Sequence, residues 1–114
     1  MATRKLDNYL RTHRKRAGFS QAEMAFLLGG GRGTKVSRYE RFKRLPELPT
    51  AFAYQVTFGI PASELFAGVF EQIRRNTVRR IRTLYRRLDT APPNRLTTQK
   101  LAALKNALNP TLKQ

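Results

Sequence analysis

The sequence has no cysteine and only one histidine, His13. Without cysteine the chain can form neither a disulfide framework nor a thiolate zinc site, and one histidine excludes the usual clusters of histidine ligands. We expect His13 to be a satisfied, half-buried side chain rather than a ligand or a base. No other group of residues suggests catalysis. The sequence therefore predicts no metal site, no cofactor and no enzymatic activity.

Long hydrophobic runs are also missing. The longest uncharged run extends from Leu48 to Ser63, and Pro49, Gly59 and Pro61 interrupt it, so it cannot span a bilayer. The basic N-terminus lacks the apolar run that a secretory signal requires. We therefore expect a cytoplasmic protein with no membrane partner.

Acidic residues are scarce, since seven Asp and Glu stand against 23 Lys and Arg, which gives a net charge of +16. The charge is not spread evenly. Residues 1–44 hold 12 basic and 3 acidic residues. Residues 45–66 hold no basic and 2 acidic residues, and residues 67–114 hold 11 basic and 2 acidic residues. Two basic blocks thus flank a nearly neutral one. Such a balance favours a polyanion as partner, and nucleic acid is the commonest one for a small intracellular protein.

The periodicity of apolar residues predicts an all-α fold. We expect a first helix over Lys5–Ala17, with Leu6, Leu10 and Ala17 facing inward. Its exposed side should carry Arg11, Lys15 and Arg16. Two short helices between residues 45 and 68 should complete a small core.

The stretch Ser20-Gln21-Ala22-Glu23 has the form of a capping box, in which Ser20 and Glu23 each bond the backbone of the other. It predicts the start of a second helix, with Met24, Leu27 and Leu28 as its apolar face. That helix must stop at Gly29.

Four glycines lie within five residues in the stretch GGGRGTKVSRYE, residues 29–40. A phosphate-binding loop would need lysine directly after the last glycine, but Thr34 separates Gly33 from Lys35. The residues before the stretch also have helical spacing instead of the strand that such a loop follows. We therefore interpret the glycines as a turn into a third helix, which begins at Gly33 or Thr34 and buries Val36 and Tyr39.

Three segments carry a resemblance to the lambda-repressor-like, or Cro-type (XRE), helix-turn-helix transcriptional regulators. They are Leu10–Gln21 (LRTHRKRAGFSQ), Val36–Arg44 (VSRYERFKR) and Gly59–Phe66 (GIPASELF). The resemblance covers about half of the chain. It implies a five-helix DNA-binding domain over residues 1–68, followed by a basic helical extension over residues 69–114 that dimerises or binds a partner.

The resemblance also implies roles for individual residues. Lambda-repressor-like proteins have a structural ion pair between helices one and three, which corresponds to Arg14 and Glu40. Four residues on or beside the recognition helix are expected to contact bases in the major groove, namely Arg32, Thr34, Lys35 and Arg38. Their side chains suit this role because arginine and lysine pair with guanine and a threonine methyl can touch thymine. The DNA backbone is expected to be bound by Gln21, Ser37, Arg41, Lys43 and Arg44.

The sequence departs from the pattern of these regulators at several places, two of which concern the start and the end of the third helix. The turn between Gly29 and Val36 holds one extra residue, and Phe42 stands where a glycine with positive φ is common. Because that conformation is costly for phenylalanine, we expect the third helix to end differently or to run longer.

The segment from Phe66 to Leu88 has an apolar stripe at helical spacing that predicts one long helix with many arginines on its other faces. Thr97 or Thr98 should cap a last, short helix that ends before Pro110. The stripe exceeds what a five-helix core needs, so we expect a two-fold homodimer through Phe70, Ile73, Ile81, Leu84 and Leu88. Alternatively, the last helix folds back onto the long one within a monomer.

Together these features predict a sequence-specific regulator that binds double-stranded DNA, acts as a repressor at an inverted-repeat operator and joins the nucleoid when bound. Two alternatives stay open. One is an antitoxin whose C-terminal extension binds a partner protein. The other is a basic RNA-binding protein, because Gly30–Gly33 has the G-x-x-G form of a KH clamp, although the strands of a KH domain are missing.

Overall fold

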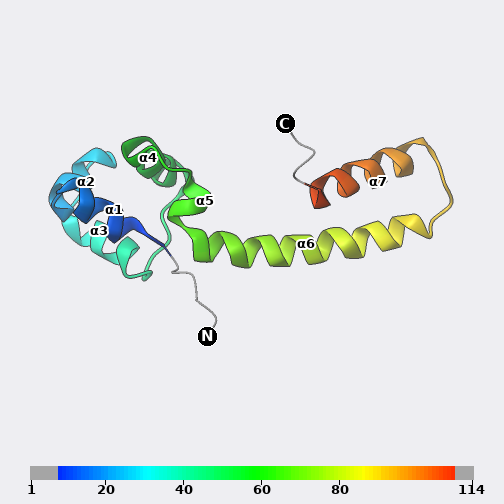
Figure 1. Ribbon diagram of the computed structural model, residues 1–114, viewed down its shortest axis with the longest axis horizontal. Helices are drawn as coiled ribbons and strands as arrows, with labels where there is room; N and C mark the ends of the chain where they lie inside the picture. The colour runs from blue at the N-terminus through cyan, green and yellow to red at the C-terminus, as the bar shows by residue number, and fades with distance from the viewer. Residues whose placement is uncertain (1–7, 110–114) are drawn as a thin grey trace. The chain divides into compact units, whose positions relative to one another are not determined.

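The computed structural model describes residues 8–109, which form seven helices and no strand, as the all-α prediction required (Figure 1). The helices are α1 (Leu10–Ala17), α2 (Gln21–Leu27), α3 (Gly33–Glu40), α4 (Leu48–Phe58), α5 (Ala62–Leu65), α6 (Ala67–Asp89) and α7 (Arg95–Leu108). None of the described helices is long and apolar enough to cross a membrane.

The chain divides into two compact units, Met1–Glu71 and Gln72–Gln114, so the break falls within α6. It lies three residues beyond the boundary expected from the sequence at residue 68. The first unit holds α1 to α5 with the first turn of α6, and the second holds the rest of α6 with α7.

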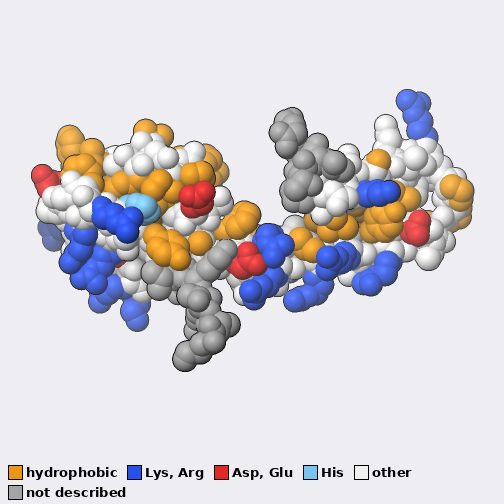
Figure 2. Space-filling model, viewed as in Figure 1, with side chains coloured by type: hydrophobic (Ala, Val, Ile, Leu, Met, Phe, Trp, Pro, Cys, Tyr) orange, Lys and Arg blue, Asp and Glu red, His pale blue; other side chains and the backbone are white. Residues whose placement is uncertain are grey.

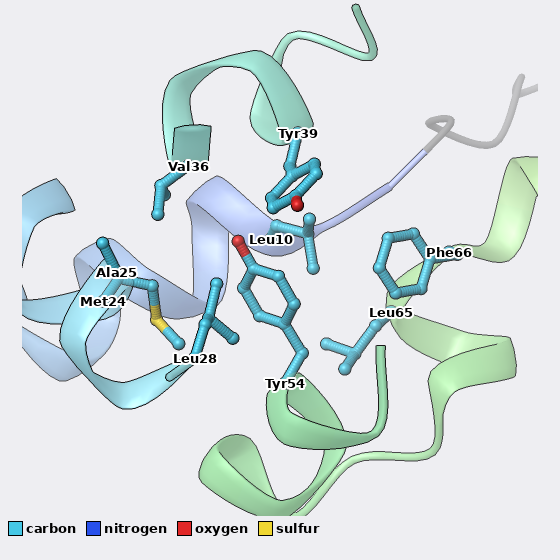
Figure 3. Packing of buried hydrophobic residues seen from close by; sticks show 9 residues of the cluster. All are labelled: Leu10, Met24, Ala25, Leu28, Val36, Tyr39, Tyr54, Leu65 and Phe66. Carbon is cyan, nitrogen blue, oxygen red and sulfur yellow. The ribbon is translucent and has the colours of Figure 1, made fainter. Parts of the chain in front are cut away.

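The core of the first unit is a single cluster in which α1 to α5 all take part (Figure 3). Leu10, Met24, Val36, Tyr54 and Leu65 are fully buried and come from five different helices. The ring of Tyr54 lies among the others and meets Tyr39 and Phe66 edge-on, with centroids 6.4 and 6.2 Å apart. The expectation that short helices four and five complete the core is therefore confirmed.

The start of α1 differs from the prediction, because α1 begins at Leu10 and not at Lys5. Tyr9 donates its backbone N–H to the carbonyl of Leu65 at 2.7 Å, and the Asn8 side chain accepts from the N–H of Leu10. These bonds hold Asn8 and Tyr9 in a non-helical path. Leu6, expected to face inward, lies outside the described residues.

Two apolar residues expected to be inward are exposed. Ala17 lies on the same face of α1 as Leu10 but at the last turn, where the chain reverses and the core no longer reaches it. Leu27 on α2 is 41% exposed, because the buried arc of that helix runs through Met24, Ala25 and Leu28 and leaves Leu27 to one side.

His13 is half-buried, and its ring lies against that of Phe58 with centroids 5.6 Å apart. Aromatic rings at such a separation pack favourably. The half-buried environment expected for His13 is thus observed. No group of three or more His, Cys, Asp or Glu residues in the described part of the chain is arranged to hold a metal ion.

The end of α3 does not change to accommodate Phe42. The helix ends at Glu40, and Phe42 takes up the positive φ of 57° that we expected it to avoid. The N–H of Phe42 bonds the carbonyl of Tyr39 at 3.1 Å, and that of Lys43 bonds Arg38 at 2.8 Å. This pair of bonds is a Schellman motif, which requires a left-handed residue at that position. The expectation of a different or longer helix was wrong.

In the second unit α7 runs back along α6 in the opposite direction (Figure 1). The partly buried apolar residues of each helix follow helical spacing: Val78, Ile81, Tyr85 and Leu88 on α6, and Leu101, Leu104 and Leu108 on α7. This arrangement corresponds to the fold-back alternative within one chain.

The cap of α7 also differs from the prediction. Asn94, not Thr97 or Thr98, precedes the helix, and its side-chain oxygen accepts from the N–H of Thr97 at 2.9 Å. Asparagine is among the strongest capping residues, and here it lies directly before the first helical turn. Thr97 is instead 92% buried.

Candidate functional site

The candidate site is the exposed side of α3 with the parts of α1 and α2 that border it. Along α3, Val36 and Tyr39 are buried in the core, as predicted. Thr34 and Arg38 are exposed, while Lys35 and Ser37 are half-buried. The helix thus presents one apolar side to the core and one polar, basic side to solvent.

Two backbone features fix the turn that leads into α3. Gly29, Gly30 and Gly31 have φ angles of 111°, 114° and 100°, which side chains rarely adopt. Gly33 opens α3 against the start of α2, where an added Cβ would lie 3.2 Å from the backbone nitrogen of Ala22. The glycines therefore serve the path of the chain and a close helix approach, which agrees with their interpretation as a turn.

Lys35 lies back over this turn. Its Nζ is 3.5 Å from the carbonyl oxygen of Gly30, at the outer limit of a hydrogen bond. Arg32, directly before α3, is exposed and forms no side-chain cap. Neither side chain is firmly held, so both can turn toward a ligand.

The capping box at the start of α2 is present as predicted. The Ser20 hydroxyl accepts from the N–H of Glu23 at 3.0 Å, and the Glu23 carboxylate accepts from the N–H of Ser20 at 2.8 Å. The bond from the Ser20 N–H, with a smaller contribution from the Ser20 hydroxyl, lowers the pKa of the Glu23 carboxyl. The box sets where Gln21 lies, and Gln21 is half-buried with its Nε2 3.4 Å from a Glu40 oxygen.

The expected ion pair between Arg14 and Glu40 joins α1 to the last residue of α3. Arg14 donates from Nε to one carboxylate oxygen at 2.5 Å and from Nη2 to the other at 3.1 Å. Its Nη1 donates to the carbonyl of Phe19 at 2.9 Å. Both side chains are almost fully buried, and the bond to Glu40 raises the pKa of Arg14. Arg14 therefore stays charged, and its bonds to Glu40 hold α3 at a fixed angle to α1.

The remaining predicted backbone-binding residues, Arg41, Lys43 and Arg44, follow α3 and are exposed. The Schellman motif at Phe42 turns the chain between them. Figure 2 shows Lys and Arg side chains gathered on the side of this unit where α3 lies. Basic side chains thus gather on the side of the first unit to which α3 belongs.

An open hollow of about 460 Å³ lies at the meeting of α1, α2 and α3. Gln21, Ser37 and Arg41, which we expect to bind the DNA backbone, line it. The Arg14–Glu40 pair and two further residues of α1, Arg11 and Lys15, complete the lining. Sequence reasoning placed these two on the outer face of the first helix but not in the site. Only the crossing of α1 over the end of α3, which Arg14 and Glu40 hold, brings them there.

The five residues expected to form a dimer interface do not share one environment. Phe70 belongs to the first unit and is 47% exposed, while Ile73 and Leu84 in the second unit are 57% and 39% exposed. Ile81 and Leu88 are half-buried. Of these five, only Ile73 and Leu84 are exposed residues of the second unit.

Comparisons of this chain with models of protein families, with curated proteins and with solved structures find no match.

Proposed function

We propose that the first unit is a helix-turn-helix domain that binds double-stranded DNA with α3 in the major groove and represses transcription by occupying an operator. The single observation that carries this proposal is the two-sided character of α3. Its buried residues Val36 and Tyr39 anchor it in the core, and its exposed residues are of the types that read base edges.

The chemistry of the exposed side supports base reading. A major groove admits one α-helix, and Arg38 can pair with the O6 and N7 atoms of guanine through two parallel hydrogen bonds. Thr34 offers a methyl group for thymine. Lys35 and Arg32 are held weakly or not at all, so they can reach the same groove.

The flanks of α3 supply the contacts that position it. Arg41, Lys43 and Arg44 after the helix are exposed and carry no sequence information when they bind phosphate, but they fix the register of the protein on the duplex. Ser37 borders the hollow with Arg11 and Lys15. Gln21 gives up only a long bond to Glu40 if it turns to phosphate.

The rigid frame under α3 also supports the proposal. Base reading needs the helix that carries the side chains to be held in place, and packing and hydrogen bonds hold it best. The buried Arg14–Glu40 pair and the close approach at Gly33 fix α3 to α1 and α2. In this proposal the pair acts on orientation and does not touch DNA.

We further propose that two copies associate through the second unit, with its exposed residues Ile73 and Leu84 as the contact. A two-fold dimer would bind two half-sites separated by about 34 Å, one turn of DNA. Sedimentation at micromolar concentration tests this part. A single species of 13.1 kDa would remove the dimer from the proposal.

Selection of bound duplexes from a random pool at physiological salt tests the proposed function. We expect an inverted repeat with half-site centres about 10 base pairs apart. On the selected site Arg38→Ala should cost about 1–3 kcal/mol of binding free energy and should change binding to random duplex little.

Lys43→Ala is the matched control, because it removes one positive charge from the flank of the same helix. It should weaken binding to selected and random duplexes alike and make the salt dependence shallower by about one contact. If Arg38→Ala leaves the ratio of the two affinities unchanged, α3 does not read bases. If no sequence is enriched at all, the proposal of a sequence-specific regulator fails.

A further inference from the structure

The second unit carries a strongly basic surface that the proposed function does not use. Residues 72–114 hold 11 Lys and Arg and one acidic residue, Asp89. The described part of α6 carries seven arginines and no lysine. Figure 2 shows a row of basic side chains along this helix.

Part of this surface is organised on one face of α6. An open hollow of about 390 Å³ is lined by Arg74, Arg75, Val78, Arg79, Arg82 and Arg86. Four of the arginines follow one another at steps of 4, 3 and 4 residues, which keeps them on one side of a helix. We call the surface formed by Arg75, Arg79, Arg82 and Arg86 the arginine face.

Three residues of the arginine face, Arg79, Arg82 and Arg86, have no acidic partner among the described residues. All three are exposed. Like charges three and four residues apart on a helix repel each other, so the face is unfavourable for the isolated chain. A polyanion that neutralises them would relieve this repulsion.

We propose that the arginine face is a second DNA-binding surface, which holds the phosphate backbone of a duplex without reading its sequence. From Arg75 to Arg86 the helix rises about 16 Å. The same length of duplex carries about nine phosphates, one for every ~1.7 Å of axis. The planar guanidinium group matches phosphate with two parallel hydrogen bonds, a geometry that lysine lacks.

The composition of the hollow argues against other partners. Protein interfaces have apolar centres that are depleted in charge, whereas this hollow contains one apolar side chain, Val78, among arginines. Protein–DNA interfaces are polar and strongly basic. Single-stranded nucleic acid is bound by aromatic side chains on which bases stack, and the hollow has none.

Binding of the full-length protein to random-sequence duplex DNA over a range of salt concentrations tests the proposal. The test variant is Arg82→Gln/Arg86→Gln. Its control is Arg80→Gln/Arg87→Gln, which removes two charges from the same stretch of α6 but from residues that do not line the hollow. Glutamine keeps a high helix propensity, and circular dichroism checks that both variants retain the helix.

We expect the test pair to make the slope of log affinity against log salt shallower by about 1.8, which corresponds to two lost phosphate contacts. The control pair should give less than half of that change. Equal changes in both pairs would mean that the charge acts only as a diffuse field, and this would overturn the proposal. A larger effect on double-stranded RNA, or on polyglutamate, than on DNA would assign the face to another partner and overturn it as well.

The proposal assumes DNA as the ligand but not the role of α3, so the two can fail separately. The test pair should leave the ratio of affinities for the selected site and random duplex unchanged, whereas Arg38→Ala should lower it. A normal Arg38→Ala result with an unchanged slope for the test pair refutes the arginine face alone. The reverse result refutes base reading by α3 and leaves a nonspecific DNA-binding helix.

Discussion

Replacing Phe42 with glycine and, separately, with alanine isolates the cost of its backbone conformation. Both variants lose the same ring, so their difference in stability comes from the backbone and one Cβ atom. Phe42 has φ 57° at the end of α3, where two backbone bonds fix the Schellman motif. The ends of α1 and α2 form the same pair of bonds, and there the equivalent residues are Gly18 and Gly29.

The expected difference follows from two opposing effects. A residue with a Cβ atom in the left-handed region costs about 1–2 kcal/mol, which glycine does not incur. Glycine loses more conformational entropy on folding than alanine, by about 0.5–1 kcal/mol. Phe42→Gly should therefore be more stable than Phe42→Ala by about 1 kcal/mol, the reverse of the order found inside helices.

Thermal unfolding followed by circular dichroism measures this difference, which corresponds to about 4 °C in Tm for a domain of this size. The control site is Val56, which is 81% exposed within α4. There the alanine variant should be more stable than the glycine variant by about 1 kcal/mol. If the alanine variant at residue 42 is as stable as the glycine variant, or more stable, the left-handed conformation at the end of α3 is refuted.

Three further predictions concern the frame of the first unit. The buried Tyr54 hydroxyl has no hydrogen-bond partner within the described chain, and burial raises its pKa, so Tyr54→Phe should leave the free energy of unfolding unchanged or raise it by about 1 kcal/mol in urea titrations. Arg14→Met should lower the free energy of unfolding by about 3–5 kcal/mol, because it leaves a buried carboxylate unpaired. Adding Glu40→Leu should recover most of that loss in urea titrations, and a double variant no more stable than the single one would contradict this. Bonds with Ser20 lower the folded-state pKa of Glu23 from 4.5, so the contribution of its carboxylate to stability is present above pH 4.5 and is lost as the pH falls through the folded-state pKa. In thermal unfolding, the stability difference between wild type and Glu23→Gln should shrink over that acidic range and be constant from pH 6 to 8.

Features that depend on nearby residues were predictable from the sequence. The capping box at Ser20 and Glu23 needs only a three-residue spacing, and the burial of Val36 and Tyr39 follows from the period of one helix. The Arg14–Glu40 pair joins residues 26 positions apart, and only the resemblance to a known family indicated it.

Features that depend on several elements at once were not predictable. Propensity argues against a left-handed Phe42, yet the two bonds that end α3 and the path to α4 impose it. The place of Arg11 and Lys15 beside the end of α3 depends on the angle between helices. The apolar stripe on α6 predicted an apolar face, but a stripe does not show which surface covers that face. In the structure α7 lies along α6 and covers part of it.

The exclusive use of arginine on α6 has a consequence for regulation in the cell. Arginine keeps its charge at every pH at which proteins fold, and acetylation, the common way to cancel a basic side chain, acts on lysine. Lysine acetyltransferases therefore cannot neutralise any of the seven basic residues of this helix. The positive charge of this helix is therefore constitutive, and ionic strength and the concentration of competing anions would modulate the DNA binding that we propose for it.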